Sequence, residues 1–105
     1  SLRSLGLGRN RLLHLPEGIG ELQALEELEV HGNQLVELPA GFGRLASLTS
    51  LNLNSNQLSE LPESFGRLGA LGVLHLERNE LASLPESFGG LAALRELYLA
   101  ENALS

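Results

Sequence analysis

The sequence predicts an α/β solenoid, with short parallel β-strands on one face and short 3₁₀ or α-helical turns on the opposite face. Three observations predict this fold. An asparagine recurs every 23 residues without any insertion, at Asn10, Asn33, Asn56, Asn79 and Asn102. Of the 28 leucines, 27 fall on one lattice in register with these asparagines, Leu13 being the exception. Each repeat also contains an apolar–polar–apolar alternation, which indicates one short strand with one buried face.

The 23-residue period divides the chain of 105 residues into four full repeats and one partial repeat. The boundaries are 2–24, 25–47, 48–70 and 71–93, with a partial repeat at 94–105. Each full repeat fits the pattern L-x-x-L-x-L-x-x-N-x-L-x-x-L-P-x-x-[FI]-G-x-L-x-x, with Val30 in place of one leucine. We expect one domain over 1–105. Because the pattern stops mid-repeat at both ends, we also expect a slice of a longer array.

The strand of each repeat is exemplified by Leu51-Asn52-Leu53, where leucines alternate with a polar residue. Strands that recur in the same direction, with a return segment between them, stack in parallel about 4.8 Å apart. The repeated asparagine follows each strand where the chain must turn inward. Its amide offers both an acceptor and donors to backbone groups that the turn leaves unpaired. The five asparagines are therefore expected to form a buried structural ladder.

The second half of each repeat predicts a short helical turn. Proline fixes φ near −65° and suits the first position of such a turn, and a Leu-Pro pair occurs at Pro16, Pro39, Pro62 and Pro85. Ile19, Phe42, Phe65 and Phe88 are expected to fill the outer side of the core. The glycine after each of them suits a close backbone approach or a positive φ. Glu17, Glu63 and Glu86 are expected to complement the amino termini of these turns.

This sequence resembles leucine-rich repeat proteins over essentially its whole length. The Leu-Pro-x-x-Phe/Ile-Gly-x-Leu segment at a 23-residue spacing is similar to intracellular members such as the Ras-suppressor, scribble-type and plant Ras-group repeats, and many bacterial proteins share it. It departs from the bacterial ubiquitin-ligase effectors, which have shorter Leu-Pro-x-Leu-Pro repeats, and from extracellular receptors with cysteine-rich caps. The resemblance implies a right-handed leucine-rich-repeat solenoid arc that binds protein on its concave face. It also implies a cytoplasmic protein, with a secreted bacterial effector as the alternative.

Residues inset between the strand leucines vary from repeat to repeat, whereas the lattice does not. Packing dictates the lattice, so the inset residues are free to carry function. Glutamate outnumbers arginine among them, which favours a protein partner with a basic surface. The predicted protein-binding residues of the concave face are Glu27, Glu29, His31, Asn52, Asn54, His75, Glu77, Arg78, Glu96 and Tyr98.

Tyr98, the single tyrosine, is expected about 5 Å from His75 on the neighbouring strand. Tyrosine is common among interface hot spots, which makes Tyr98 the leading candidate anchor. The alternative is that Tyr98 packs against a following repeat or cap.

Composition and spacing argue against several other functions. The chain has no Cys and no Lys, which excludes thiol and lysine chemistry, and its net charge of −6 opposes binding to nucleic acid. No apolar run approaches the roughly 20 residues of a membrane span. The three histidines lie too far apart to share a metal ion. A flat, open face also lacks the oxyanion pocket that acyl transfer needs. We therefore expect no enzyme activity, cofactor or metal, and neither nucleic acid nor membrane as a partner.

The leading functional hypothesis is a protein–protein interaction module. The alternatives are a regulatory or substrate-recognition segment of a larger signalling enzyme or bacterial effector, and an engineered repeat scaffold. Uncapped strand edges further predict end-to-end self-association of this chain.

Overall fold

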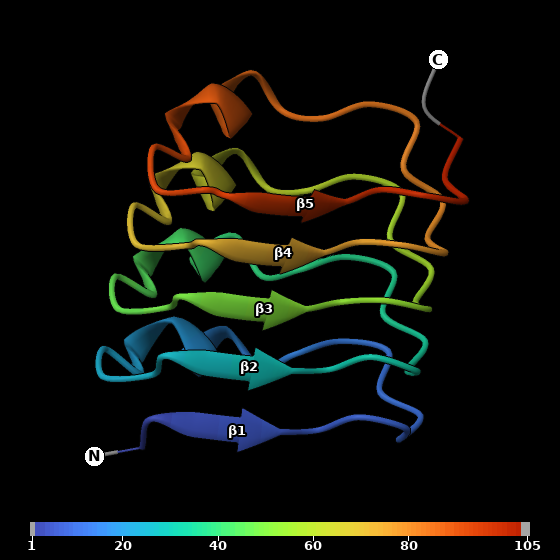
Figure 1. Cartoon of the computed structure of the whole chain (residues 1–105). Helices are drawn as coiled ribbons and strands as arrows, with labels where there is room; N and C mark the ends of the chain where they lie inside the picture. The colour runs from blue at the N-terminus through green and yellow to red at the C-terminus, as the bar shows by residue number, and fades with distance from the viewer. Residues whose placement is uncertain (1, 104–105) are drawn as a thin grey trace.

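The structure is a computed structural model that describes residues 2–103. Five three-residue strands form one parallel sheet in the order of the sequence (Figure 1). They are β1 (Ser4–Gly6), β2 (Glu27–Glu29), β3 (Ser50–Asn52), β4 (Val73–His75) and β5 (Glu96–Tyr98). The register pairs each residue with the one 23 positions later, as in Leu28 with Leu51 and Leu51 with Leu74. The predicted fold class is confirmed.

Short 3₁₀ turns lie on the other side of the core from the strands (Figure 1). They are η1 (Glu17–Glu21), η2 (Phe42–Arg44), η3 (Glu63–Arg67) and η4 (Glu86–Gly90). The prediction that proline occupies the first helical position was wrong by one residue. Pro16, Pro62 and Pro85 are the extended residues that precede their turns, and their carbonyls accept the first turn hydrogen bond. Pro39 accepts the equivalent bond, although η2 begins only at Phe42.

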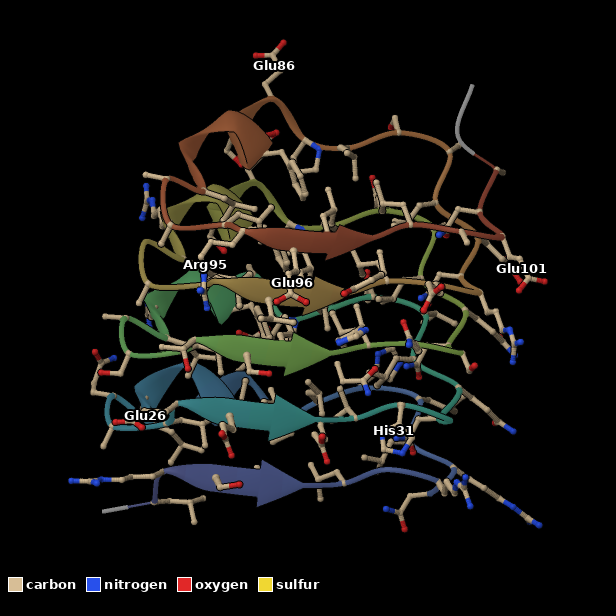
Figure 2. All side chains as sticks on the ribbon, in the orientation of Figure 1. Glu26, His31, Glu86, Arg95, Glu96 and Glu101 are labelled. Atoms are coloured by element: carbon tan, nitrogen blue, oxygen red, sulfur yellow. The ribbon has the colours of Figure 1, made fainter. Side chains whose placement is uncertain are left out.

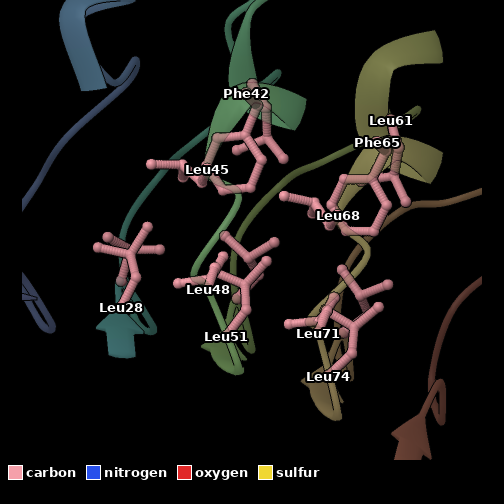
Figure 3. Close-up of a cluster of buried hydrophobic side chains, with 14 of the residues drawn as sticks. Leu28, Phe42, Leu45, Leu48, Leu51, Leu61, Phe65, Leu68, Leu71 and Leu74 are labelled. Carbon is pink, nitrogen blue, oxygen red and sulfur yellow. The ribbon is translucent and has the colours of Figure 1, made fainter. Parts of the chain in front are cut away.

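The core lies between the strands and the 3₁₀ turns and is built from lattice residues of adjacent repeats. Leu28, Leu51 and Leu74 are fully buried on the strand side, and the rings of Phe42 and Phe65 cover the opposite side (Figure 3). The phenylalanine rings form a continuous stack, because Phe42–Phe65 and Phe65–Phe88 both have centroids 6.1 Å apart. Every repeat therefore packs on its neighbours, as stacked repeats must to bury a common core.

The asparagine ladder is present and links successive repeats. Asn56 Nδ2 donates to the carbonyls of Val30, one repeat back, and Leu53, at 3.0 and 3.1 Å. Its Oδ1 accepts a hydrogen bond from the backbone N–H of Leu35 at 3.1 Å. Asn33 and Asn79 make the same set and are buried like Asn56.

The expectation that all five ladder positions are buried was wrong at the ends. Asn10 is exposed, and its amide reaches only carbonyls of its own repeat, those of Leu7 and Gly8. Asn102 is partly buried, but it still bridges to Leu76 at 2.7 Å. Burial of the asparagine therefore depends on repeats on both sides of it.

The glycine that follows each aromatic residue fits a close approach between repeats. A Cβ on Gly43 would collide with the backbone carbonyl of Ser64, and one on Gly66 would collide with that of Ser87. Gly89 has open space instead. The close-approach prediction is confirmed for Gly43 and Gly66, and also for Gly20, where a Cβ would lie 2.6 Å from the carbonyl oxygen of Gly41. It does not hold for Gly89, because no further 3₁₀ turn follows η4 among the described residues.

Candidate functional site: the strand face

The strand face consists of the outward side chains of the five strands and of the residues that immediately follow them (Figure 2). Because the register is constant, these side chains form columns across the sheet, one residue from each repeat. One column contains Gly6, Glu29, Asn52, His75 and Tyr98, and the next contains Gly8, His31, Asn54, Glu77 and Ala100. The structure brings all ten predicted binding residues onto this one face. Whether they bind a partner stays a prediction.

His75 and Tyr98 form a parallel ring stack at the β5 end of the face. Their centroids are 4.6 Å apart and their planes differ by 7°. The predicted proximity of the two rings is therefore confirmed. Tyr98 is 38% exposed, so its ring remains accessible.

Glu96 holds the hydroxyl end of Tyr98. The Tyr98 hydroxyl donates to Glu96 Oε1 at 2.8 Å. This hydrogen bond, together with the negative charge of Glu96, raises the pKa of Tyr98 above its ordinary value of 10.0. The hydroxyl is neutral near pH 7, and its hydrogen bond directs the proton at Glu96.

The centre of the strand face is more tightly bonded than the sequence suggested. Asn54 Oδ1 accepts the backbone N–H of Glu77 at 2.7 Å, and Asn54 Nδ2 donates to Glu77 Oε1 at 3.4 Å. Asn52 Oδ1 accepts the backbone N–H of Asn54 at 3.0 Å. The expectation that inset residues stand outside the structural framework was wrong for Asn54, because this residue bridges two repeats and is partly buried.

Two other predicted binding residues, His31 and Arg78, also contact residues of this chain. The His31 ring lies so close over Gly8 that a Cβ there would come within 2.6 Å of its Cε1 atom, so the glycine makes room for the ring. His31 Nδ1 is buried without a hydrogen-bond partner among the described residues. Arg78 Nε donates to Glu101 Oε2 at 3.0 Å, and this bond raises the pKa of Arg78. Both side chains of that pair are well exposed, so the ion pair adds little stability.

The exposed carboxylates of Glu27 and Glu29 have no hydrogen-bond or ion-pair partner among residues 2–103. They leave β2 as an acidic, unneutralised part of the face. No group of three histidine or glutamate side chains that could hold a metal ion occurs in the described part of the chain. No helix within residues 2–103 is long and apolar enough to cross a bilayer.

No residue pattern in the sequence predicted the backbone conformation of the last column of the strand face, which includes Arg78. Arg9, Ser55, Arg78 and Glu101 have φ values of 59° to 62°, the left-handed region that non-glycine residues seldom adopt. Only Gly32 in this column, with φ of 68°, is the residue type that this conformation favours. The turn that leads each strand toward its ladder asparagine requires this conformation in every repeat.

A groove that was not predicted from the sequence lies on the return segments, which run behind the strands in Figure 1 from the ladder to the 3₁₀ turns. This return groove has a volume of about 860 Å³. It is lined by His14, Leu15, Glu17, Glu37, Leu38, Pro39, Ala40, Glu60, Leu61, Pro62, Glu63, Ser83, Leu84, Pro85 and Glu86. The 23-residue spacing of Glu37 to Glu60 and of Glu63 to Glu86 was the available signal for it.

Comparison with known proteins identifies the family. Residues 1–58 and 61–104 match the family model described as leucine rich repeat. The chain belongs to the leucine-rich repeat family. No curated protein sequence matches this leucine-rich repeat chain.

Solved structures of other leucine-rich repeat proteins are similar to this chain. A Leptospira interrogans leucine-rich repeat protein is 36% identical with a TM-score of 0.94, over 96% of this chain and 26% of that protein. An internalin from Listeria monocytogenes is 29% identical with a TM-score of 0.81, over 98% of this chain and 30% of the internalin. A plant peptide hormone receptor, solved in complex with its hormone, is 31% identical with a TM-score of 0.85, over 95% of this chain and 17% of the receptor. This leucine-rich repeat chain thus spans less than a third of each.

Proposed function

We propose that this chain is a non-catalytic protein-interaction module that binds its partner on the strand face, the face that the family resemblance makes concave. The observation that carries the proposal is the partly exposed His75–Tyr98 stack, on the same face as the carboxylates of Glu27 and Glu29, which lack partners among residues 2–103. A planar, partly exposed aromatic pair offers contact area at little entropic cost, which is the usual character of a binding hot spot. The plant receptor that is similar to this chain was solved in complex with a peptide hormone, which supports a polypeptide partner.

The partner is expected to present a basic surface. Glu27, Glu29 and Glu96 are exposed on the strand face, whereas Arg78 is already paired with Glu101. A basic partner would be steered to this face and would associate faster at low salt. Tyr98 would then act as the apolar anchor and the carboxylates as the surrounding charged rim.

The experiment selects peptides that bind the chain from a displayed random library and measures their affinity for variants. Tyr98→Ala should weaken a selected peptide by about 2 kcal/mol or more, because it removes the anchor. Glu27→Arg combined with Glu29→Arg should act mainly on the association rate and on its salt dependence.

The matched controls are Arg44→Ala and Arg67→Ala on the 3₁₀ turns, where both side chains are exposed. These should leave affinity unchanged. Selected peptides that lose affinity with the arginine variants and keep it with the strand-face variants would refute this binding mode.

We further propose that the chain associates end to end through the open edges of β1 and β5. Edge strands present unpaired backbone groups that can pair with another chain. Apolar side chains are also uncovered there, since Leu2 is 46% exposed and Leu97 is 37% exposed. Sedimentation should show concentration-dependent association. A monomer at every concentration would contradict it.

A further inference from the structure

The return groove has an apolar floor that four repeats build together. The second, third and fourth repeats each contribute a Leu-Pro pair and the first contributes Leu15, and these leucines face the core. Leu15, Leu38 and Leu61 are buried beneath the groove, and Leu84 is partly buried. The proline rings of the same pairs line it directly, as at Pro39, Pro62 and Pro85. The groove is therefore a continuous channel across the repeats and not a pocket within one of them.

Carboxylates line both sides of this floor. One row precedes the Leu-Pro pairs and the other follows them, and the two rows comprise Glu37 and Glu60, and Glu17, Glu63 and Glu86. All five side chains are exposed, and Figure 2 shows Glu86 projecting away from the ribbon. Glu37 and Glu60, and likewise Glu63 and Glu86, occupy equivalent positions of neighbouring repeats, so the two carboxylates of each pair repel one another. Ala40 separates Glu17 from Glu63.

No counter-charge neutralises these rows within residues 2–103. None of the five carboxylates takes part in an ion pair or a side-chain hydrogen bond there. No arginine lines the groove. Arg44 and Arg67 line a separate hollow of about 220 Å³ on the 3₁₀ turns, which meets the groove at Glu17 and Ala40. The groove thus combines an apolar floor with unneutralised negative walls.

We propose that the return groove binds an extended, arginine- or lysine-rich segment of a partner protein. Four repeats span about 15 Å, which roughly five residues of extended chain cover. Side chains of an extended segment alternate between two sides, so its basic groups can reach both carboxylate rows. Their aliphatic stems can lie on the leucine and proline floor. Charge complementarity therefore selects a basic segment, and the shape of the groove selects an extended one.

Other cationic occupants fit the groove less well. The carboxylates stand in rows along the repeats and do not converge, and no group of three that could hold a metal ion occurs among the described residues. A small polyamine would meet the charges but would leave the apolar floor largely uncovered. The proposed segment uses both features at once.

The experiment measures binding of a fluorescent ten-residue peptide of five Arg-Pro pairs by anisotropy. The prolines favour an extended polyproline II helix with three residues per turn, so successive arginines point in different directions around it and can reach both carboxylate rows. The test variant carries Glu37→Gln, Glu60→Gln, Glu63→Gln and Glu86→Gln. The matched control carries Glu21→Gln, Glu26→Gln, Glu80→Gln and Glu101→Gln, which remove the same number of exposed carboxylates from outside the groove and outside the predicted strand-face site.

The wild-type chain should bind this peptide with an affinity that falls as salt is added. The return-groove variant should bind at least about tenfold more weakly, and the control variant should stay within about threefold of wild type. Equal losses in the two variants would show a general attraction to a chain of net charge −6 and would overturn the proposal. No binding by the wild-type chain, a loss confined to the control variant, or spermine binding as tightly as the peptide would also overturn it.

This test is independent of the strand-face proposal. A peptide selected for the strand face should bind the return-groove variant as well as it binds wild type. Failure of one proposal is therefore visible without failure of the other.

Discussion

Within one strand, packing constrains the residue of the buried lattice, whereas the neighbouring residues of the strand face can vary. In β3, Leu51 is fully buried and pairs with leucines on both sides, while Ser50 and Asn52 beside it are only partly buried. The lattice residue is nearly the same in every repeat, and the outward residue at position 50 is Ser, Glu or Val in its equivalents. The comparison teaches that packing between repeats fixes one set of side chains and leaves the other available for recognition.

The largest loss of stability is expected when a buried lattice leucine is truncated. Leu51→Ala removes a fully buried side chain from between two repeats, and such changes cost about 2–5 kcal/mol because a cavity remains. Ser50→Ala, on the outward side of the same strand, should change the free energy of unfolding by less than about 0.5 kcal/mol. Urea unfolding of both variants measures the difference. Similar losses of unfolding free energy in the two variants would contradict the distinction between lattice and outward positions.

The second comparison tests whether the lattice depends on a following repeat. Gly66→Ala places a Cβ against the backbone of Ser87, whereas Gly89→Ala meets open space. Overpacking of this kind costs about 1–3 kcal/mol, so Gly66→Ala should lower the thermal midpoint and Gly89→Ala should not. A destabilised Gly89→Ala would mean that another part of the chain covers this position.

The ladder should show an effect of similar or slightly smaller size. Asn56→Ala leaves the backbone partners Leu35, Val30 and Leu53 without their side-chain hydrogen bonds. We expect a loss of about 1–3 kcal/mol in unfolding free energy. Gln57→Ala is the matched control, because Gln57 is adjacent and exposed. Equal denaturant midpoints for the two variants would contradict a stabilising role of the ladder.

The smallest expected effect is electrostatic and lies on the strand face. Tyr98 is the only tyrosine and the chain has no tryptophan, so ultraviolet absorbance between pH 9 and 12 reports this one hydroxyl. Its pKa should lie above 10.0, and Glu96→Gln should lower it toward that value. The native state then holds the proton more tightly than the unfolded chain, so this contribution is complete below pH 10 and is lost as pH rises through the native pKa. An unchanged titration in Glu96→Gln would contradict the Glu96–Tyr98 hydrogen bond.

The repeat period alone was enough to predict the strands, their parallel register and the position of the ladder. A constant spacing of 23 residues places equivalent residues side by side whatever their detailed conformation. The adjacency of His75 and Tyr98 followed for the same reason. These features depend only on which residues occupy equivalent positions.

The missed features depend on geometry within the repeat. The left-handed backbone conformation at Arg9, Ser55 and Arg78 could not be inferred from glycine, because the turn imposes this conformation on other residue types. The Asn54–Glu77 bridge needs side-chain reach between repeats, and the return groove needs the depth between two surface rows. The repeat spacing alone does not give the reach of the Asn54 side chain or the depth of the groove.

The central claim is that outward residues of the strand face can change while the lattice holds the fold, which is what a recognition surface requires. The most direct measurement is urea unfolding of one chain that carries Glu27→Ser, Glu29→Ser, His75→Ser and Tyr98→Ser, beside the single variant Asn56→Ala. These four side chains lie outside the ladder and the core. We predict that the unfolding free energy of the fourfold variant stays within about 1 kcal/mol of wild type, and that the single ladder variant loses more. A fourfold variant that is less stable than Asn56→Ala would show that the strand face is part of the framework, and would contradict the claim.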